Sequence, residues 1–451
     1  MLRARPDLEF VAQDQEHGDR YTVKDTVSLE YFLLRGREHF LLRALSSPKT
    51  VEELHEEYRQ SHPGEELSLD EVRRFCVVLH ECSLVSAEGA GQGRQLAERA
   101  AKKRPNRWLW LLSPLAIRLP GFDPTPLLSA LRWWGSIAFS RVFAVLLAAA
   151  VLLVGLSLLR SVEELAADLA GLAHLADPRY AVAAALALVL VKSWHELGHA
   201  LACQRFGGEC HEVGVMLLAL MPCLYCDASD AWAFRRRRQR AVVALGGVYF
   251  ELVLATAALA SWMVLAPGFP RVFVLYVAVI ASVSSVLVNL NPLMRFDGYY
   301  LLSDAWGVAN LQQQSRQALW APLARWISGR NTPEQPLDAP RVLLVVYALA
   351  SIAQMTMVIG TILWVSHRTL SELGFRFAAD TLVAVTLGGV LVRCLVGVTQ
   401  PLRGRRFEKH LAPALRLGLV LSVAALGLWA VASVPIEQTL WSPCRIESDR
   451  I

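Results

Sequence analysis

Seven long apolar segments constrain the fold of this chain more than any other feature of its sequence. A helix that crosses the hydrocarbon core of a bilayer needs about 20 mostly apolar residues. The segments of that kind are Val142–Leu159, Tyr180–Cys203, Ala241–Leu265, Val272–Leu290, Val342–Val365, Thr381–Val398 and Leu417–Val434. The sixth is the weakest, because Arg393 interrupts it. The pattern predicts a mainly α-helical, polytopic membrane protein with about seven transmembrane helices.

The amino-acid composition supports a membrane protein and excludes several other classes. Hydrophobic residues make up 54% of the chain and charged residues 19%, against roughly 45–50% and about 25% in soluble globular domains. A disordered or collagen-like chain is thereby excluded. A secreted disulfide scaffold is also excluded, since the eight cysteines are thinly spread and no signal peptide precedes the polar N-terminus. The net charge of +5 is small, and no nucleic-acid partner is expected.

The charged residues between the apolar segments predict the orientation of the chain in the membrane. Basic residues gather after the second, fourth and sixth segments, and such a bias marks the cytoplasmic side. They are Arg205, Arg235 to Arg238, Arg240, Arg295, Arg316, Arg325, Arg330, Arg403, Arg405, Arg406 and Lys409. The stretch Ser161–Asp177 instead holds four carboxylates and no Lys or Arg. We therefore expect a multi-pass protein of the cytoplasmic (inner) membrane, with its N-terminus inside and residues 435–451 as an extracytoplasmic tail.

Residues 1–95 predict a small cytoplasmic α+β domain of the winged-helix type. Thr50 with Glu53, and Ser68 with Glu71, have the spacing of a capping box, so two helices are expected to begin there. The alternation along Tyr21–Val27 predicts a strand. Residues 96–136 are basic and rich in tryptophan, as expected of a linker at a membrane interface. Residues 137–434 then form the transmembrane domain, with its core at 180–300.

One cluster of polar residues interrupts the second apolar segment. His195, Glu196 and His199 form a His-Glu-x-x-His pattern, and such residues are costly at membrane depth, which makes them a functional hypothesis by default. On a helix the two histidines lie on one face, close enough for both imidazoles to bind one Zn²⁺, while the Glu can act on a metal-bound water as general base. The alternative is a pair of histidines that hydrogen-bond inside a helix bundle.

A catalytic zinc usually takes three protein ligands, and the end of the fourth segment offers the third. Pro292 ends or kinks that helix, and Gly298 frees the backbone so that Asp297 can turn toward the bundle. The second and fourth segments are both expected to run from the outer side of the membrane to the cytoplasmic side. At about 1.5 Å per residue, His195 lies roughly 22 Å from the outer end of its helix. It is therefore expected near the cytoplasmic side, where Asp297 also emerges. The alternative for Asp297 is an interfacial carboxylate that caps a turn.

These two elements together resemble the site-2 protease family of intramembrane zinc metallopeptidases, over about residues 180–300. That family pairs an HExxH helix with a later Asn-x-x-Pro-x-x-x-x-Asp-Gly element, here Asn289, Pro292, Asp297 and Gly298. The resemblance implies His195, His199 and Asp297 as zinc ligands and Glu196 as the catalytic residue. It implies Asn289 as a residue that positions the substrate or transition state, and we add Asn291 and Glu251 as candidates for that role.

Glu251 marks a departure from the family pattern. The family often has a Gly-Pro-x-x-Asn element in the intervening helix, and the best match here is Gly247-Val248-Tyr249-Phe250-Glu251, without the Pro and with Glu in place of Asn. A carboxylate inside an apolar segment needs a partner. Glu251 is therefore expected to line the site, to compete as a ligand, or to form an ion pair with a nearby Arg.

A weaker resemblance concerns the N-terminal domain, which is similar to the PqqD-type winged helix that binds leader peptides. It rests on Tyr21–Val27, the helix pattern and the Thr50-Val51-Glu52-Glu53 start. Some membrane proteins of this branch continue into a HlyD-like export adaptor. Residues 435–451 are too short for one, so any adaptor is expected to be a separate chain. The expected partners are thus a membrane or leader peptide, the lipid bilayer and such an adaptor.

Four cysteines offer a second metal hypothesis. Cys223 and Cys226 form a CxxC, with Cys203 and Cys210 upstream, and four thiolates would suit a structural zinc. Ordinary reduced thiols are the alternative. The same stretch, Cys210–Asp227, is apolar enough to form a re-entrant or sheet-like edge that receives a peptide by strand addition.

Together these patterns predict an intramembrane zinc metalloprotease that hydrolyses a peptide bond in a membrane-spanning or membrane-associated peptide. Its setting would be peptide maturation and export, or regulated intramembrane proteolysis. The alternative from another class is a non-proteolytic membrane component of a peptide export or maturation system, which binds cargo through the N-terminal domain. A zinc transporter is a third hypothesis, but its path would need acidic and His residues on several spans.

Overall fold

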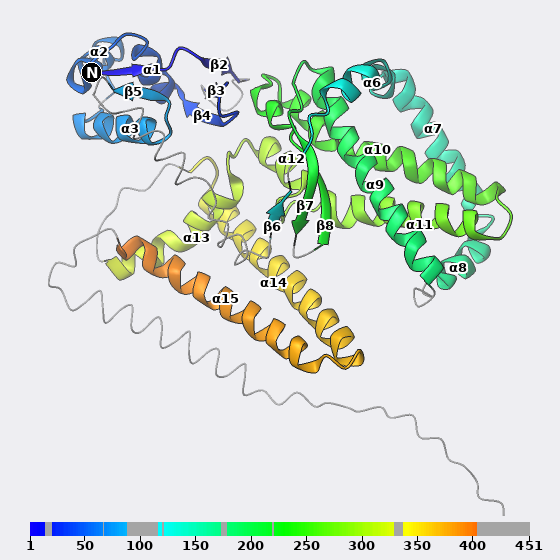
Figure 1. Cartoon of the computed structure of the whole chain (residues 1–451). Coiled ribbons are helices and arrows are strands. Elements are labelled where there is room, and N and C mark those ends of the chain that lie inside the picture. Colours follow the sequence, from blue (N-terminus) through cyan, green and yellow to red (C-terminus); the bar gives the residue numbers. More distant parts are fainter. Residues whose placement is uncertain are drawn as a thin grey trace, which may run out of the picture. The chain divides into compact units, whose positions relative to one another are not determined.

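The computed structural model describes most of the chain and divides it into two compact units, Met1–Ala309 and Asn310–Ile451 (Figure 1). The described residues are 1–13, 20–65, 67–87, 116–119, 121–172, 178–218, 221–328 and 337–403. Most of the expected basic linker, the seventh apolar segment and the expected extracytoplasmic tail lie outside these ranges.

Residues 1–87 form the N-terminal domain, a small α+β region. Strands β2 (Leu8–Ala12), β3 (Arg20–Asp25) and β4 (Tyr31–Arg35) make an antiparallel sheet in which Val23 lies opposite both Phe10 and Phe32. A second antiparallel pair joins the two ends of the domain. The remaining elements are β1 (Leu2–Ala4), α1 (Gly36–Ala44), α2 (Val51–Ser61), α3 (Leu69–Glu81) and β5 (Val85–Ala87).

Both predicted capping boxes are present. Thr50 Oγ1 accepts from the Glu53 N–H at 3.2 Å, and Glu53 Oε2 accepts from the Thr50 N–H at 2.8 Å. Ser68 and Glu71 make the same reciprocal pair at the start of α3. The predicted strand corresponds to β3. The apolar faces of these elements bury large side chains, including Leu42, Leu45, Leu54, Tyr58 and Val72.

Five of the described helices are long and apolar enough to cross a membrane. They are α7 (Arg141–Leu158), α9 (Pro178–Arg205), α10 (Arg237–Val264), α11 (Phe269–Val283) with the π-helical segment Ser284–Asn289 that continues it, and α14 (Arg341–Glu372). They correspond to the first five predicted segments. The sixth lies in helix α15 (Arg376–Arg403), whose side chains from residue 390 onward are outside the described part.

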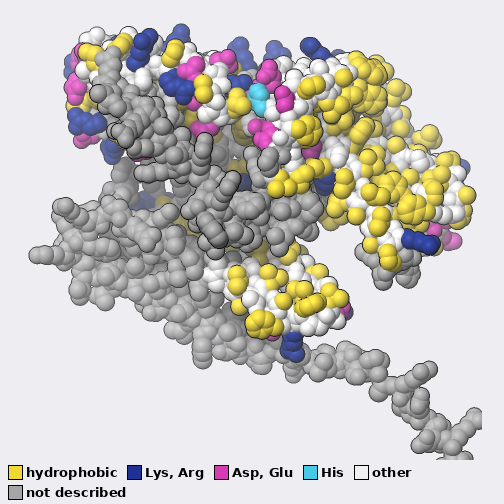
Figure 2. All heavy atoms as spheres, in the orientation of Figure 1, with side chains coloured by type: hydrophobic (Ala, Val, Ile, Leu, Met, Phe, Trp, Pro, Cys, Tyr) yellow, Lys and Arg dark blue, Asp and Glu magenta, His cyan; other side chains and the backbone are white. Residues whose placement is uncertain are grey.

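Helices α9, α10 and α11 pack against one another through small residues. Their shared core holds Ala183, Ala187, Ala255, Ala258, Ala278 and Ala281, as expected where helices associate by close backbone approach rather than by hiding apolar surface from water. A few large side chains, such as Phe250 and Trp262 of α10, are buried as well. Many other large apolar side chains lie on the outside, and Figure 2 shows hydrophobic side chains crowded over the part of the first unit that contains α7 to α11. This apolar exterior is compatible with a membrane protein.

Three shorter helices flank these in the first unit: α6 (Thr125–Ala138), α8 (Val162–Gly171) and α12 (Asp297–Trp306). Buried arginines join two of them to the long helices. Arg240 near the start of α10 donates to Asp304 of α12 at 2.9 Å, and Arg271 of α11 donates to Asp168 of α8 at 2.9 Å. The sequence pattern places Arg240 in a basic loop, but its side chain is 8% exposed because this ion pair draws it inward.

The stretch expected to form a sheet-like edge is a β-hairpin. Strands β7 (Val213–Leu218) and β8 (Met221–Cys226) pair antiparallel, and β6 (Ala116–Arg118) adds to β7. β8 packs against α9 on one side. Within the described part of the chain, its outer edge has no strand partner.

A short 3-10 turn after β8, Ser229–Ala233, contacts the N-terminal sheet within the first unit. Asp230 accepts hydrogen bonds from Tyr31 Oη and from Lys24 Nζ, the latter at 2.9 Å. Burial alone would raise the pKa of Asp230, but these donors and the Glu209 N–H outweigh it, so the pKa lies below the usual value for an aspartate.

In the second unit, α13 (Leu311–Ser328) packs against α14, and α14 packs against α15. Gln314 of α13 makes two hydrogen bonds, at 2.6 and 3.0 Å, with Asp338, which lies in the segment just before α14.

Candidate metal centre

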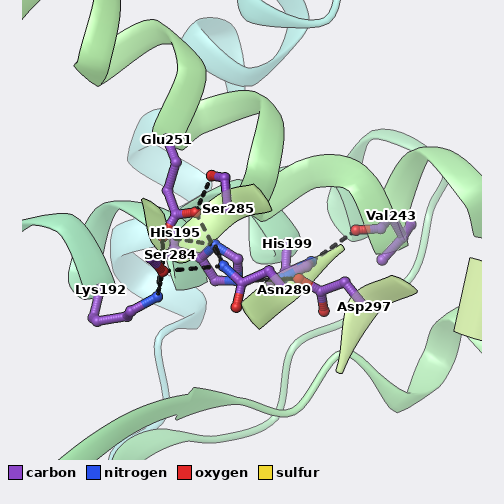
Figure 3. Close-up of polar contacts among 9 residues, drawn as sticks. All are labelled: Lys192, His195, His199, Val243, Glu251, Ser284, Ser285, Asn289 and Asp297. Carbon is purple, nitrogen blue, oxygen red and sulfur yellow. Dashed lines mark hydrogen bonds and ion pairs between the residues drawn. The ribbon is translucent and has the colours of Figure 1, made fainter. Parts of the chain in front are cut away.

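His195 and His199 lie one helical turn apart on α9, and their rings meet edge to face (Figure 3). The two Nε2 atoms are 3.0 Å apart. Nδ1 of His199 lies 2.7 Å from the carbonyl oxygen of Val243 on α10. A carbonyl can only accept, so Nδ1 of His199 carries the proton and its Nε2 presents a lone pair.

Asp297 comes to the two histidines from the start of α12. Its Oδ2 lies 3.2 Å from His195 Nε2 and 3.4 Å from His199 Nε2. Gly298 permits this approach for a different reason from the one expected. Its φ is ordinary, but a Cβ there would lie 2.3 Å from the carbonyl oxygen of Leu290. The turn is therefore possible because glycine lets α12 start directly against the end of the π-helical segment.

Three atoms that can bind a metal thus converge on one point, and they are the only such group among the described residues. Their separations of 3.0, 3.2 and 3.4 Å match the edges of a tetrahedron, about 3.3 Å, around a zinc with ligands at about 2.05 Å. Asp297 Oδ2 is buried, and none of the residues that the structure describes donates a hydrogen bond to it. Two imidazoles and a carboxylate are a donor set that suits zinc.

Glycines let α9 and α10 approach closely at the level of the histidines. A Cβ on Gly198 would lie 2.3 Å from the backbone oxygen of Gly246, and a Cβ on Gly247 would lie 2.4 Å from the His195 ring. Real Cβ atoms do not tolerate such distances. Gly247, which matches the glycine of the Gly-Pro-x-x-Asn element, is therefore explained sterically, because the missing side chain leaves room for the His195 ring.

Glu196 follows His195 and lies beside the three-atom cluster. It is half-buried and makes no hydrogen bond or ion pair with any residue that the structure describes. A carboxylate that is partly buried without such a partner is costly, and groups of this kind occur where function requires them.

Glu251 of α10 is completely buried and is surrounded by polar groups from α9 and from the π-helical segment that continues α11 (Figure 3). Its oxygens contact His195 Nδ1 at 3.3 Å and Lys192 Nζ at 3.1 Å. Asn289 Nδ2 lies 3.0 Å away, and Ser284 and Ser285 also donate to the carboxylate. The expected ion pair is therefore present, but its cation is Lys192 and not an arginine.

The two candidate asparagines have different surroundings. Asn289 is buried, and its Nδ2 lies 3.3 Å from His195 Nδ1. Asn291 belongs to the loop before α12, where its Oδ1 accepts from the Leu293 N–H at 2.9 Å, an Asx turn that fixes the loop. The structure thus brings Asn289 to the site and gives Asn291 a local role.

The cysteines do not form a second described metal group. Cys210 lies just before β7 and Cys226 ends β8, and their sulfurs are 2.9 Å apart at the open end of the hairpin. Cys203 contacts the Glu209 carbonyl instead. No cluster of three metal-binding side chains among the described ones includes a cysteine, and the side chain of Cys223 lies outside them.

Three groups at the site were missed by reasoning from sequence: Lys192, the Ser284–Ser285 pair and the Val243 carbonyl. Lys192 had a signal, since it is a charged residue in an apolar segment three positions before His195. Serines are common in apolar helices, and a backbone carbonyl leaves no trace in the sequence.

Comparisons with protein-family models, with curated proteins and with solved structures find no match for this chain.

Proposed function

We propose that this protein is a zinc metalloendopeptidase of the site-2 protease type, with its active site among membrane-spanning helices. The observation that carries the proposal is the convergence of two imidazole nitrogens and a buried carboxylate oxygen at separations of 3.0 to 3.4 Å. No described group donates to that oxygen, and the neighbouring Glu196 carboxylate has no hydrogen-bond or ion-pair partner in the described part of the chain. Three acceptors that face one another repel unless a cation lies between them. The position of Glu196 within the His-Glu-x-x-His pattern favours a catalytic rather than a purely structural metal.

In this proposal His195, His199 and Asp297 hold the zinc. When bound, the ion lowers the pKa of a water and polarises a peptide carbonyl. Glu196 takes a proton from the attacking water at its carboxylate and passes it to the amide nitrogen that leaves. Asn289, buried next to His195, is the chain's candidate for positioning the substrate, as the family resemblance implies.

The substrate class follows from the surroundings of the site. A helical peptide hides its carbonyls in hydrogen bonds, so a membrane-spanning or membrane-associated substrate must locally unwind before hydrolysis. The outer edge of β8, packed beside α9, is suited to receive an extended peptide by strand addition. The positive-inside bias favours a cytoplasmic-membrane location with the N-terminal domain inside, where that domain would recruit a leader peptide.

The test is cleavage of a co-expressed, epitope-tagged membrane peptide that the wild type processes. Glu196→Gln should lose activity by about 10²–10⁴-fold while the purified protein keeps its zinc, and His199→Ala should lose both. Glu163→Gln, on an exposed carboxylate of α8, is the matched control. Unchanged processing in both site variants would contradict the proposal and favour a non-proteolytic role in peptide export or maturation.

A further inference from the structure

Glu251 has no solvent-exposed surface, and five groups of the chain surround its carboxylate. Oε1 lies within 3.1 to 3.3 Å of Lys192 Nζ, Ser284 Oγ and His195 Nδ1. Oε2 accepts from Ser285 and, at 3.0 Å, from Asn289. A carboxylate offers about four lone-pair sites, so the chain's own groups occupy all of its accepting capacity.

The surroundings of His195 Nδ1 bear on where the ring carries its proton. Glu251 Oε1 and Asn289 Nδ2 each lie 3.3 Å from Nδ1, and Asn289 Nδ2 is nearer to Glu251 Oε2, at 3.0 Å. When a cation is held among His195 Nε2, His199 Nε2 and Asp297 Oδ2, His195 Nε2 must present its lone pair, so the proton lies on Nδ1. Glu251 Oε1 is then the acceptor that Nδ1–H faces.

The π-helical segment explains how α11 supplies so many donors. Its backbone has the i→i+5 hydrogen bond of a π-helix, from the Leu290 N–H to the Ser285 carbonyl at 2.9 Å. The wider turn brings Ser284, Ser285 and Asn289 to the same carboxylate. Such segments occur often at functional sites.

We propose that Glu251 is a positioning residue for His195, with Lys192 as its counter-ion. Glu251 holds the imidazole in the Nδ1–H form and in one orientation, as carboxylates commonly do for metal-bound histidines. The inference rests on the proposed metal centre but not on the reaction that occurs there. In this proposal Glu251 does not contact the substrate, because its oxygens are buried and already accept hydrogen bonds from the chain's own groups.

The roles of the two charges are separable. Lys192 compensates the carboxylate, which would otherwise be an isolated charge among apolar helices. Lys192→Met alone should therefore impair folding more than the double variant Lys192→Met with Glu251→Gln, in which neither charge remains.

The experiment measures zinc affinity of the full-length protein in detergent by competition with a chelator. Glu251→Gln keeps the size of the side chain but loses the charge, and we expect 10–100-fold weaker zinc binding. The visible absorption spectrum of the cobalt-substituted protein should change as well, because the orientation of His195 changes. Thr256→Ala is the matched control, since Thr256 is also buried on α10 but donates only to the Leu252 carbonyl.

Wild-type zinc affinity together with a wild-type cobalt spectrum in Glu251→Gln would overturn the positioning role. If Glu251→Gln is too poorly folded to measure, Ser285→Ala tests the same role, because it removes one donor and leaves the carboxylate in place. It should weaken zinc binding by a smaller factor, and no change in affinity or spectrum would count against the proposal. If Glu251→Gln weakens zinc binding and alters the cobalt spectrum as expected, but the wild-type protein cleaves no peptide, the protease proposal is refuted and the positioning role of Glu251 is still supported.

Discussion

The N-terminal domain and the bundle of helices α9, α10 and α11 differ in the side chains that they bury. The domain buries large side chains such as Leu42, Leu54 and Tyr58 and keeps most of its charges outside. The bundle buries alanines, glycines and a polar network around Glu251 together with a few large side chains such as Phe250 and Trp262, and many of its other large apolar side chains lie on the outside. In the domain, burial of apolar area supplies the stability. In the bundle, close backbone contact and satisfied polar groups must supply it.

The comparison predicts that the two regions respond oppositely to side-chain size. In the domain a loss of volume should be damaging, and in the bundle a gain should be.

Gly198→Ala should have the largest effect. The added Cβ would lie 2.3 Å from the Gly246 backbone oxygen, which has no freedom to move aside. Helices α9 and α10 must then separate, at a cost of about 3 kcal/mol or more, and zinc binding should be lost. Gly155→Ala on α7 is the control, since its Cβ meets nothing within 4 Å. Zinc binding by both variants at wild-type affinity would refute the close-contact account.

Leu54→Ala should be the most damaging of the changes in the N-terminal domain. Leu54 is fully buried, and its truncation should cost roughly 2–5 kcal/mol of domain stability. Hydrogen exchange of the amides in β3 and α2 of the full-length protein measures that loss. Zinc affinity should stay unchanged, and a parallel fall in zinc affinity would contradict the independence of the two cores.

Asp25→Asn should destabilise the domain by about 2 kcal/mol, because it weakens a hydrogen-bonded charge pair. Asp25 is buried and accepts from Arg5 at 2.8 and 2.9 Å and from the Val27 N–H at 2.9 Å. Burial would raise the pKa of Asp25, but these donors outweigh it and lower the pKa.

A carboxyl with a lowered folded-state pKa stabilises the domain above its unfolded pKa of about 3.9, and that contribution is lost as pH falls through the folded-state value. The wild-type domain should therefore lose amide protection below about pH 4. Asp25→Asn removes this titration, so a variant with the same acid dependence as the wild type would show that other carboxyls control it.

Thr50→Ala should have the smallest effect, about 1 kcal/mol, through the loss of the side-chain cap of α2. Amide exchange in the first turn of α2 should rise while the exchange of α3 stays constant. Ser68→Ala is the paired variant for α3, and it should reverse that pattern.

Sequence reasoning succeeded where the signal is local. The capping boxes at Thr50 and Ser68 fixed two helix starts, because a cap involves residues three apart. It missed α1, which begins after Arg35 without a side-chain cap from Ser, Thr, Asp or Asn. The first five apolar segments matched helices, because span length and hydropathy are sequence properties.

The site divides in the same way. The i, i+4 spacing predicted the meeting of His195 and His199, and the motif after α11 supplied Asp297. Of the roles expected for Glu251, one was an ion pair with an arginine, and the ion pair is present but with Lys192 as its cation. The sequence could not show this, because the phase of the π-helical segment and the position of Lys192 depend on how α9, α10 and α11 pack. The reason for Gly298 was also mistaken, because a close backbone approach to Leu290 is a tertiary property.

The two histidines differ in what holds them. A side chain orients His195, whereas the backbone carbonyl of Val243 orients His199. Mutation can replace Glu251 by another hydrogen-bonding residue, and the ring of His195 is then open to retuning. No change at position 243 removes a main-chain oxygen, apart from one that unwinds α10. A single substitution can therefore change the group that orients His195, whereas the group that orients His199 is part of the main chain and is kept as long as α10 stays helical.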